Sequence, residues 1–286
     1  MWLLLAFLTA LSESFKDVFS KFSLKNTHPV MVAFAMRMFA LPFLIPLLWF
    51  IEIPETGDYF WIALFTGGLL NILITILYLN AIQHSDLSLT VPMVTFTPLF
   101  LLITSPLILG EIPDAKGIAG VLCIVAGSYF LQFSSRKKGF LAPFATLFSE
   151  KGPRLMLLVA FLWSITANID KVGVQNSSPF FWVISVSVFL FIGMIPLVFW
   201  KARGQVPHLK NNFAVIFPVG LFTALTLIFQ MHAIELTHVA YVIAVKRTSA
   251  LFVVFFGVIF FKEKGFGNRV FAVLIMLLGV ALISVF

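Results

Sequence analysis

Charged side chains interrupt several of the long apolar stretches in this sequence, and they are the residues best able to do chemistry. Glu13, Lys16 and Asp17 lie close together in the first stretch, and Asp170 and Lys171 are adjacent in a later one. On helix-insertion scales, a charged residue at the centre of a membrane helix costs about 2.5–3.5 kcal/mol. Such residues are therefore the first place to look for a binding site, a coupling proton carrier or structural ion pairs.

Three further cations interrupt apolar stretches, Arg37 and the adjacent Lys246 and Arg247. With the bases named above they exceed the buried acids by two positive charges, and an anionic substrate is one counter-charge for them. Arg offers a bidentate fork and Lys a point charge, so Lys246 and Arg247 suit a phosphate or carboxylate group. Packing or backbone pairing is the alternative for these two residues. An ion pair with Asp17 is the alternative for Arg37.

Uncharged polar and aromatic side chains also occur inside the apolar stretches, and several can line a substrate cavity. The candidates are Tyr78, Trp163, Asn168 and Tyr241. Hydrogen bonding between helices is the other role open to such residues. The single cysteine, Cys123, lies in an apolar stretch, and no clustered His or acidic metal motif is present, so the sequence predicts no metal site and no cofactor.

The amino-acid composition predicts the secondary structure that carries these charged and polar residues. The chain is 60% hydrophobic and 11% charged, with a mean hydropathy of +1.06, whereas a soluble domain carries roughly 25% charged residues. The apolar residues fall into blocks close to the roughly 17–25 residues that cross a bilayer as a helix, the element that satisfies its own backbone hydrogen bonds. An all-α membrane protein of ten transmembrane helices is therefore predicted, over 2–22, 29–51, 59–81, 87–109, 115–133, 155–174, 179–200, 213–234, 239–261 and 270–286.

The net charge of +7 is divided unevenly between the two sides of the predicted membrane protein, which argues against a nucleic-acid surface. Loops on one side contain a single base, Lys116. Thirteen of the 19 Lys and Arg residues belong to the other side: Lys21, Lys25, Arg136, Lys137, Lys138, Lys151, Arg154, Lys201, Arg203, Lys210, Lys262, Lys264 and Arg269. By the positive-inside rule that side is cytoplasmic, so both termini are expected outside the cell (inner) membrane.

An internal duplication is indicated by tripeptides that recur in register. Ala6-Phe7-Leu8 aligns with Ala160-Phe161-Leu162, and Ile45-Pro46-Leu47 aligns with Ile195-Pro196-Leu197. A polar, basic connection over 134–153 separates a first five-helix repeat, 1–133, from a second, 154–286. An odd number of crossings per half predicts repeats that are inverted relative to one another, as in alternating-access transporters whose site lies at the repeat interface.

A family resemblance is carried by the fourth and ninth predicted helices. One runs from Pro98 to Gly110-Glu111, and the other opens on Lys246-Arg247-Thr248-Ser249-Ala250 and closes on Lys262-Glu263. With two five-helix halves, this pattern resembles the EamA-type branch of the drug/metabolite transporter superfamily. The resemblance implies ten helices around a central cavity, and activities from export of amino acids and metabolites to exchange of sugar phosphates or nucleotide sugars.

The function expected is secondary active transport, by export or exchange, of a small anionic metabolite such as an organophosphate, carboxylate or amino acid. The pair Lys246 and Arg247 resembles the one with which plastid phosphate translocators hold a phosphate. Glu13 instead resembles the proton-binding and cation-binding Glu of the small multidrug resistance transporters, which makes a proton-coupled exporter of lipophilic cations one alternative. A lipid-headgroup flippase is another. An enzyme is not expected, since no His-Glu-x-x-His or Gly-x-Ser-x-Gly motif occurs.

The charge distribution predicts the orientation of the C-terminus. A reporter fused after Phe286 should be active outside the cytoplasm, because the basic loops direct the other side inward. Paired fusions of alkaline phosphatase and a fluorescent protein measure this. A cytoplasmic C-terminus would reverse the side assignment.

Overall fold

A computed structural model describes residues 1–24, 27–84, 91–133, 150–202, 204, 212–252 and 270–284, and every regular element within these ranges is a helix. The first half contains α1 (Trp2–Ser23), α2 (Pro29–Leu44), η1 (Ile45–Trp49), α3 (Phe60–His84), η2 (Val91–Phe96), α5 (Thr97–Leu109) and α6 (Ala115–Phe133). The second half contains α8 (Lys151–Gln175), α9 (Pro179–Lys201), α11 (Phe213–Leu236), α12 (Val239–Lys246) and α14 (Val270–Ser284). The all-α fold class is confirmed.

Five helical segments are long and apolar enough to cross a membrane by length and composition. They are Pro29–Trp49, Phe60–Ala81, Lys151–Gln175, Pro179–Lys201 and Phe213–Leu236. Shorter apolar helices occupy Met93–Leu109, Ala115–Leu131 and Val270–Ser284. Each of the ten segments expected from the sequence contains a helix within the described residues. α1 has sufficient length, but Glu13, Lys16 and Asp17 place three charges in its second half.

The fourth predicted helix is interrupted, which the sequence analysis did not anticipate. The 3-10 helix η2 occupies Val91–Phe96, and the α-helix α5 begins only at Thr97. Proline lacks the N–H that an α-helical hydrogen bond requires, and Pro92 and Pro98 flank this change. Residues 87–90 of the expected helix lie outside the described part of the chain.

The ninth predicted helix is also interrupted near its centre. α12 ends at Lys246, after which Thr248 N bonds Val245 O at 2.9 Å and Leu251 N bonds Thr248 O at 2.8 Å. These are the i→i−3 bonds of a tighter turn. The Thr248 hydroxyl also donates to Val245 O at 2.7 Å, so a side chain competes for that carbonyl. The remainder of the expected helix, 253–261, lies outside the described residues.

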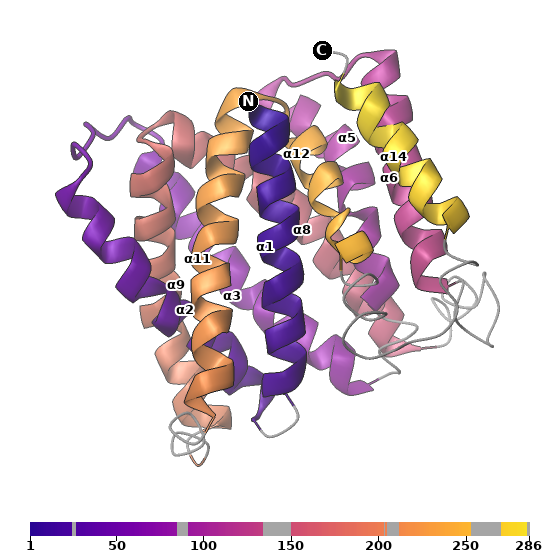
Figure 1. Ribbon diagram of the computed structural model, residues 1–286. Coiled ribbons are helices and arrows are strands. Elements are labelled where there is room, and N and C mark those ends of the chain that lie inside the picture. Colours follow the sequence, from indigo (N-terminus) through magenta and orange to yellow (C-terminus); the bar gives the residue numbers. More distant parts are fainter. Residues whose placement is uncertain are drawn as a thin grey trace.

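Most contacts that a helix of one half makes are matched by a contact of the corresponding helix in the other half. α1 packs against α11, and its counterpart by sequence alignment, α8, packs against α3. α1 also contacts α12, as α8 contacts α5. α11 packs against α2, as α3 packs against α9. Two further contacts, α2 with α9 and α6 with α14, each join an element to its own counterpart (Figure 1). This pattern is expected for two related halves around a pseudo-twofold axis.

The directions of α1 and α8 are opposite. The Trp2 ring at the start of α1 lies 6.4 Å from the Tyr241 ring in the first turns of α12. Lys171, near the end of α8, hydrogen-bonds Thr237 O, which directly precedes α12. α1 therefore begins at the end of the bundle where α8 finishes. We call this the Trp2 end, at the top of Figure 1.

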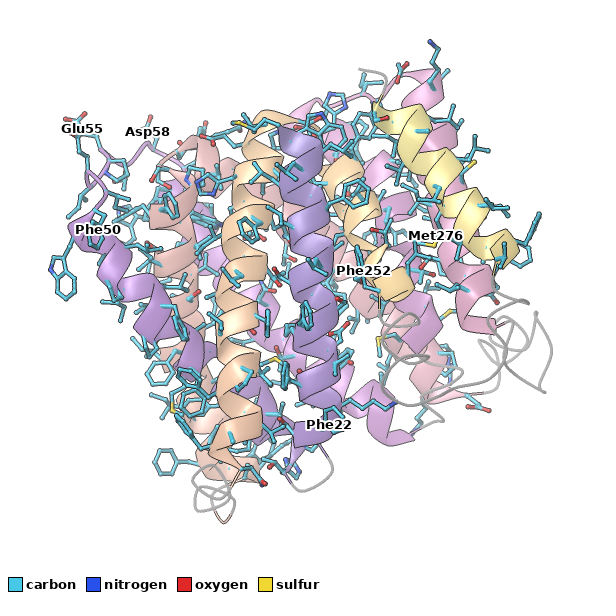
Figure 2. All side chains as sticks on the ribbon, viewed as in Figure 1. Phe22, Phe50, Glu55, Asp58, Phe252 and Met276 are labelled. Carbon is cyan, nitrogen blue, oxygen red and sulfur yellow. The ribbon has the colours of Figure 1, made fainter. Side chains whose placement is uncertain are left out.

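The two ends of the bundle differ in character, as Figure 2 shows. The acidic side chains Glu55 and Asp58 lie at the Trp2 end, whereas Phe22 marks the opposite end of α1. Between the ends, large apolar side chains cover the outside of the helices. Exposed examples are Leu4, Phe65, Leu69, Ile103, Leu107, Ile192, Leu274 and Leu278. Such a surface suits the lipid bilayer and not water.

Candidate functional site

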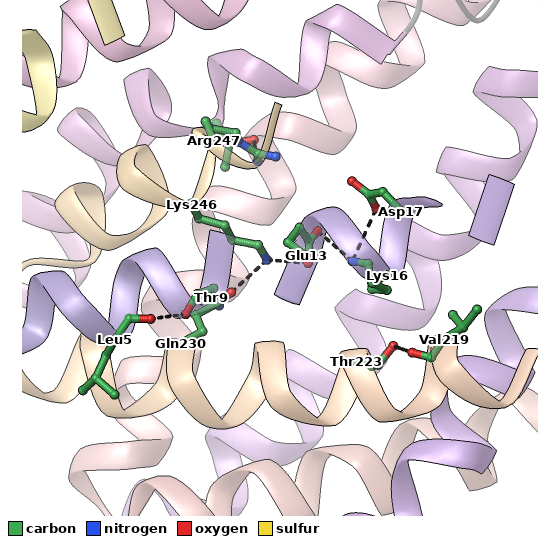
Figure 3. A network of polar contacts seen from close by, with 11 residues as sticks. Leu5, Thr9, Glu13, Lys16, Asp17, Val219, Thr223, Gln230, Lys246 and Arg247 are labelled. Atoms are coloured by element: carbon green, nitrogen blue, oxygen red, sulfur yellow. Dashed lines mark hydrogen bonds and ion pairs between the residues drawn. The ribbon is translucent and has the colours of Figure 1, made fainter. Parts of the chain in front are cut away.

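The middle of α1 carries a chain of ion pairs that extends to α12. Lys16 Nζ lies 2.7 Å from Glu13 Oε1 and 3.9 Å from Asp17 Oδ1. Lys246 Nζ approaches the other Glu13 oxygen, Oε2, at 3.6 Å (Figure 3). Glu13 and Lys16 are one turn apart on the same helix face, so their pairing is local. The contact with Lys246 brings together residues from opposite halves of the chain.

Lys246 is held by α11 as well as α1. Its Nζ donates to Gln230 Oε1 at 2.9 Å, and Gln230 is buried. Glu13 Oε2 is buried and accepts no hydrogen bond from the described residues, so the 3.6 Å contact with Lys246 is electrostatic only. Lys246 therefore shares Glu13 with Lys16 as a partial counter-ion. Its hydrogen-bond partner is neutral.

Arg247 occupies the place where the two interrupted helices meet. Its Nη2 donates to Thr97 Oγ1 at 3.1 Å, and Thr97 is the first residue of α5. The Arg247 Nε atom is buried and has no acceptor in the described parts of the chain, and no carboxylate there lies within ion-pairing distance. Glu13 and Asp17 act on Arg247 only at longer range. Arg247 is thus a half-buried cation with no direct counter-ion among the residues that the structure describes.

Arg37 does not pair with Asp17. α2 packs against α9 and α11 and is not a main neighbour of α1, so the two side chains belong to helices that are not in close contact. Within the described ranges no carboxylate forms an ion pair with Arg37, and its closest electrostatic influences are Asp170 and Glu13. Asp170 Oδ1 itself accepts a hydrogen bond from Trp182 Nε1 at 3.0 Å.

Lys171 belongs to a separate contact at the Trp2 end. Its ammonium pairs with Glu111 and also donates to Thr237 O at 2.7 Å. From the sequence, Lys171 was grouped with the buried cations, and Glu111 was named only at the close of the fourth predicted helix. Glu111 balances the charge of Lys171, so Lys171 is removed from the count of unbalanced cations. The remaining cations of the membrane interior exceed its acids by one instead of two.

Asn168 and Tyr241 have structural contacts, and neither is hydrogen-bonded to Glu13, Lys16, Asp17, Lys246 or Arg247 in the described residues. Asn168 is fully buried, accepts from Ser105 Oγ at 2.7 Å and donates to Thr104 Oγ1 at 3.0 Å. These contacts tie α8 to α5 and use both ends of the amide. Tyr241 is buried at the Trp2 end, where its hydroxyl donates to Asp114 Oδ1 at 3.2 Å.

Tyr78 and Trp163 form an aromatic pair between α3 and α8. Their ring centroids are 5.9 Å apart and tilted at 38°. Both side chains are partly exposed, and Tyr78 lies within electrostatic reach of Asp17 and Glu13. The pair joins α3 to α8 within electrostatic reach of these two acids of α1. We call Glu13, Lys16, Asp17, Lys246 and Arg247 the charged cluster.

Sequence comparison identifies the family once this arrangement is known. The sequence model of the EamA-like transporter family matches residues 1–133 and 151–285. This chain belongs to the EamA-like transporter family. It is accordingly a multi-pass membrane transporter of the drug/metabolite transporter superfamily, a family of transporters and not of enzymes. The two matched stretches correspond to the halves whose packing is related in the structure.

Comparison of structures supports the fold. One solved crystal structure superposes with a TM-score of 0.80, covering 99% of this chain and 96% of its own, at 14% sequence identity. At that identity the likeness shows the fold alone. No curated protein matches the chain in sequence. Within the described residues, no group of three or more His, Cys, Asp or Glu side chains is arranged to hold a metal ion.

The contacts of Asn168 predict a stability defect. Asn168→Ala should lower the free energy of unfolding by about 1–3 kcal/mol, because it leaves buried hydroxyls on α5 without partners. Thermal unfolding in detergent measures this. Asn71→Ala is the matched control, since Asn71 Nδ2 donates only to Gly67 O in its own helix. Unchanged stability with weakened ligand binding would instead return Asn168 to the substrate site.

Proposed function

We propose that this transporter is a secondary active transporter that moves a small anionic metabolite by alternating access, as an exporter or exchanger. The single observation that carries the proposal is Arg247, a half-buried cation whose buried Nε has no acceptor and which has no direct counter-ion in the described residues. A cation in that condition is costly unless an anion visits it.

The charge balance of the middle of the bundle supports an anion. Four cations remain there, Lys16, Arg37, Lys246 and Arg247, against the three acids of the sequence analysis. A substrate that brings one negative charge would balance the set. Organophosphates, carboxylates and amino acids all carry an oxyanion group that an Arg fork and a Lys ammonium can hold together.

Alternating access is supported by the arrangement of the helices. α1 and α8 run in opposite directions, and contacts recur when the halves are exchanged, as expected for inverted repeats. The interruptions in the fourth and ninth predicted helices lie at the Thr97–Arg247 contact, and interrupted helices line the substrate sites of many transporters.

The full architecture proposed is ten transmembrane helices around a central cavity. Its two inverted repeats are 1–133 and 154–286, and the connection between them is 134–153, of which 134–149 lie outside the described residues. In this proposal Lys246, Arg247 and Arg37 bind the anion, with Tyr78 and Trp163 beside it. Both termini are outside the inner membrane.

A proton-coupled exporter of lipophilic cations is the second candidate. The observation that favours it is Asp17, whose side chain is 51% exposed although it lies well within α1. An accessible carboxylate near the aromatic pair Tyr78 and Trp163 suits a cation. The excess of cations around the same place weighs against it.

Neutral substitutions separate these candidates. Lys246→Gln and Arg247→Gln should each weaken binding of an anionic substrate by about 10–100-fold, the loss expected for one charge-assisted hydrogen bond. Ligand-induced thermal shift and transport in proteoliposomes measure this. Lys201→Gln is the control, since Lys201 is exposed at the end of α9 and lies over the Trp200 ring. If neither cluster variant weakens any anion, or only cations bind, the second candidate is favoured.

Glu13 is the proposed carrier of a coupling proton. Glu13→Gln should abolish accumulation driven by a proton gradient, because the carboxylate that loads and releases the proton is gone, and leave substrate exchange largely intact. Uptake and counterflow in the same vesicles distinguish these two activities. Loss of both would indicate a defect in binding or folding, and unchanged gradient-driven uptake would exclude Glu13 from coupling.

A further inference from the structure

A buried contact at the Trp2 end joins three parts of the chain through one carboxylate. Glu111 Oε1 pairs with the Lys171 ammonium of α8, and Oε2 accepts a hydrogen bond from Val239 N at 2.9 Å, at the start of α12. Lys171 also donates to Thr237 O, between α11 and α12. We call the contact of Glu111 with Lys171 and this backbone the Glu111 bridge.

The backbone after α5 holds Glu111 in place. α5 ends with Gly110 in the left-handed conformation, at φ 69°, which glycine adopts without steric cost. Gly110 N then bonds Pro106 O at 3.2 Å, and Glu111 N bonds Ser105 O at 3.3 Å. With this capping arrangement, the Glu111 side chain contacts Lys171 of α8 and the backbone at the start of α12.

Among the charged side chains that form ion pairs within the described residues, exposure increases from the bridge toward Asp17. Lys171 and Glu111 are 7% and 11% exposed, Glu13 is 15% exposed, and Lys16 and Lys246 are each 18% exposed. Asp17, one helical turn farther than Glu13 from the Trp2 end, is 51% exposed. Thr9 and Ala10, which lie between Glu13 and the Trp2 end on α1, are fully buried. The helices are therefore closely packed between Glu13 and the Trp2 end, whereas Asp17 on the other side of Glu13 is exposed.

We propose that the Glu111 bridge is a gate, which holds the Trp2 end closed in this state and separates when the transporter opens toward that end. This inference rests on the proposed alternating access. Glu111 links the end of α5 to α8 and to the start of α12. Parting any of these elements breaks the ion pair or the bond to Val239 N, so the bridge favours the closed state and must be lost in the open one.

A buried reporter on α1 can test the gate. Thr9 is fully buried and lies one helical turn from Glu13 toward Trp2 (Figure 3). In a Cys123→Ser background, Thr9→Cys should react slowly with a maleimide while the Trp2 end is closed. Glu111→Gln and Lys171→Gln, each added separately, should raise the labelling rate by about tenfold or more, because each leaves a buried partner unpaired.

Three controls separate a gate from general loosening. Lys171→Arg keeps the charge and should keep labelling slow. Asp114→Asn removes the charge of the neighbouring carboxylate, which is no part of the bridge. Its oxygen accepts from Gly117 N at 2.9 Å and from the Tyr241 hydroxyl at 3.2 Å, and an amide oxygen can accept both bonds, so this change should also leave Thr9→Cys slow. Ser187→Cys on α9, equally buried, should remain slow in every variant.

Several results would contradict the proposal that the Glu111 bridge is a gate. These are unchanged labelling in both Gln variants, equal acceleration at Ser187→Cys, or failure of both Gln variants to fold, which would make the bridge a folding determinant. Thermal shift of the Cys123→Ser background with phosphorylated and carboxylated metabolites tests the proposed function separately. Faster Thr9→Cys labelling without any anion binding would leave the gate standing and reject the anionic substrate.

Discussion

Burial of charged side chains between apolar helices is the constraint on which the rest of this structure depends. A charge inside a membrane protein needs a counter-charge, a hydrogen-bond partner or water. Glu13 and Lys16 meet that need within one helix, whereas Lys246 needs both α1 and α11. Arg247 is left with only Thr97 and long-range attraction. Glu13 and Lys16 therefore have partners within the bundle, whereas we propose that Arg247 is available to a substrate.

The two polar contacts between halves have different consequences for movement. The cluster around Lys246 lies where two interrupted helices meet, so changes in its charge can alter the positions of α5 and α12. The Glu111 bridge lies at the Trp2 end and connects the same elements. An anion that draws Lys246 away from Glu13 would act on α12, which begins at the bridge. The proposed site and the proposed gate therefore share a helix, which is the simplest physical route by which one could act on the other.

Sequence patterns were sufficient for the helical class, the family and the positions of most helices, because apolar length and repeated tripeptides are local signals. They were not sufficient for pairing. An ion pair with Asp17 was one of two predictions for Arg37, yet α2 is not a main neighbour of α1. The pairing of Glu111 was not predicted because its partners, Lys171 and Val239, are distant in the sequence. One signal in the sequence did point to Glu111. A Glu recurs at the close of the fourth and ninth predicted helices, as Glu111 and Glu263.

The central claim is that the excess positive charge around Lys246 and Arg247 is balanced by an anionic substrate. The most direct measurement is the thermal shift of the purified wild-type transporter against matched sets of phosphorylated metabolites, carboxylates, amino acids and lipophilic cations, since a ligand stabilises the state it binds. The account predicts that stabilising ligands carry an oxyanion group and that their effect weakens as salt is raised. Stabilisation by lipophilic cations alone would contradict it.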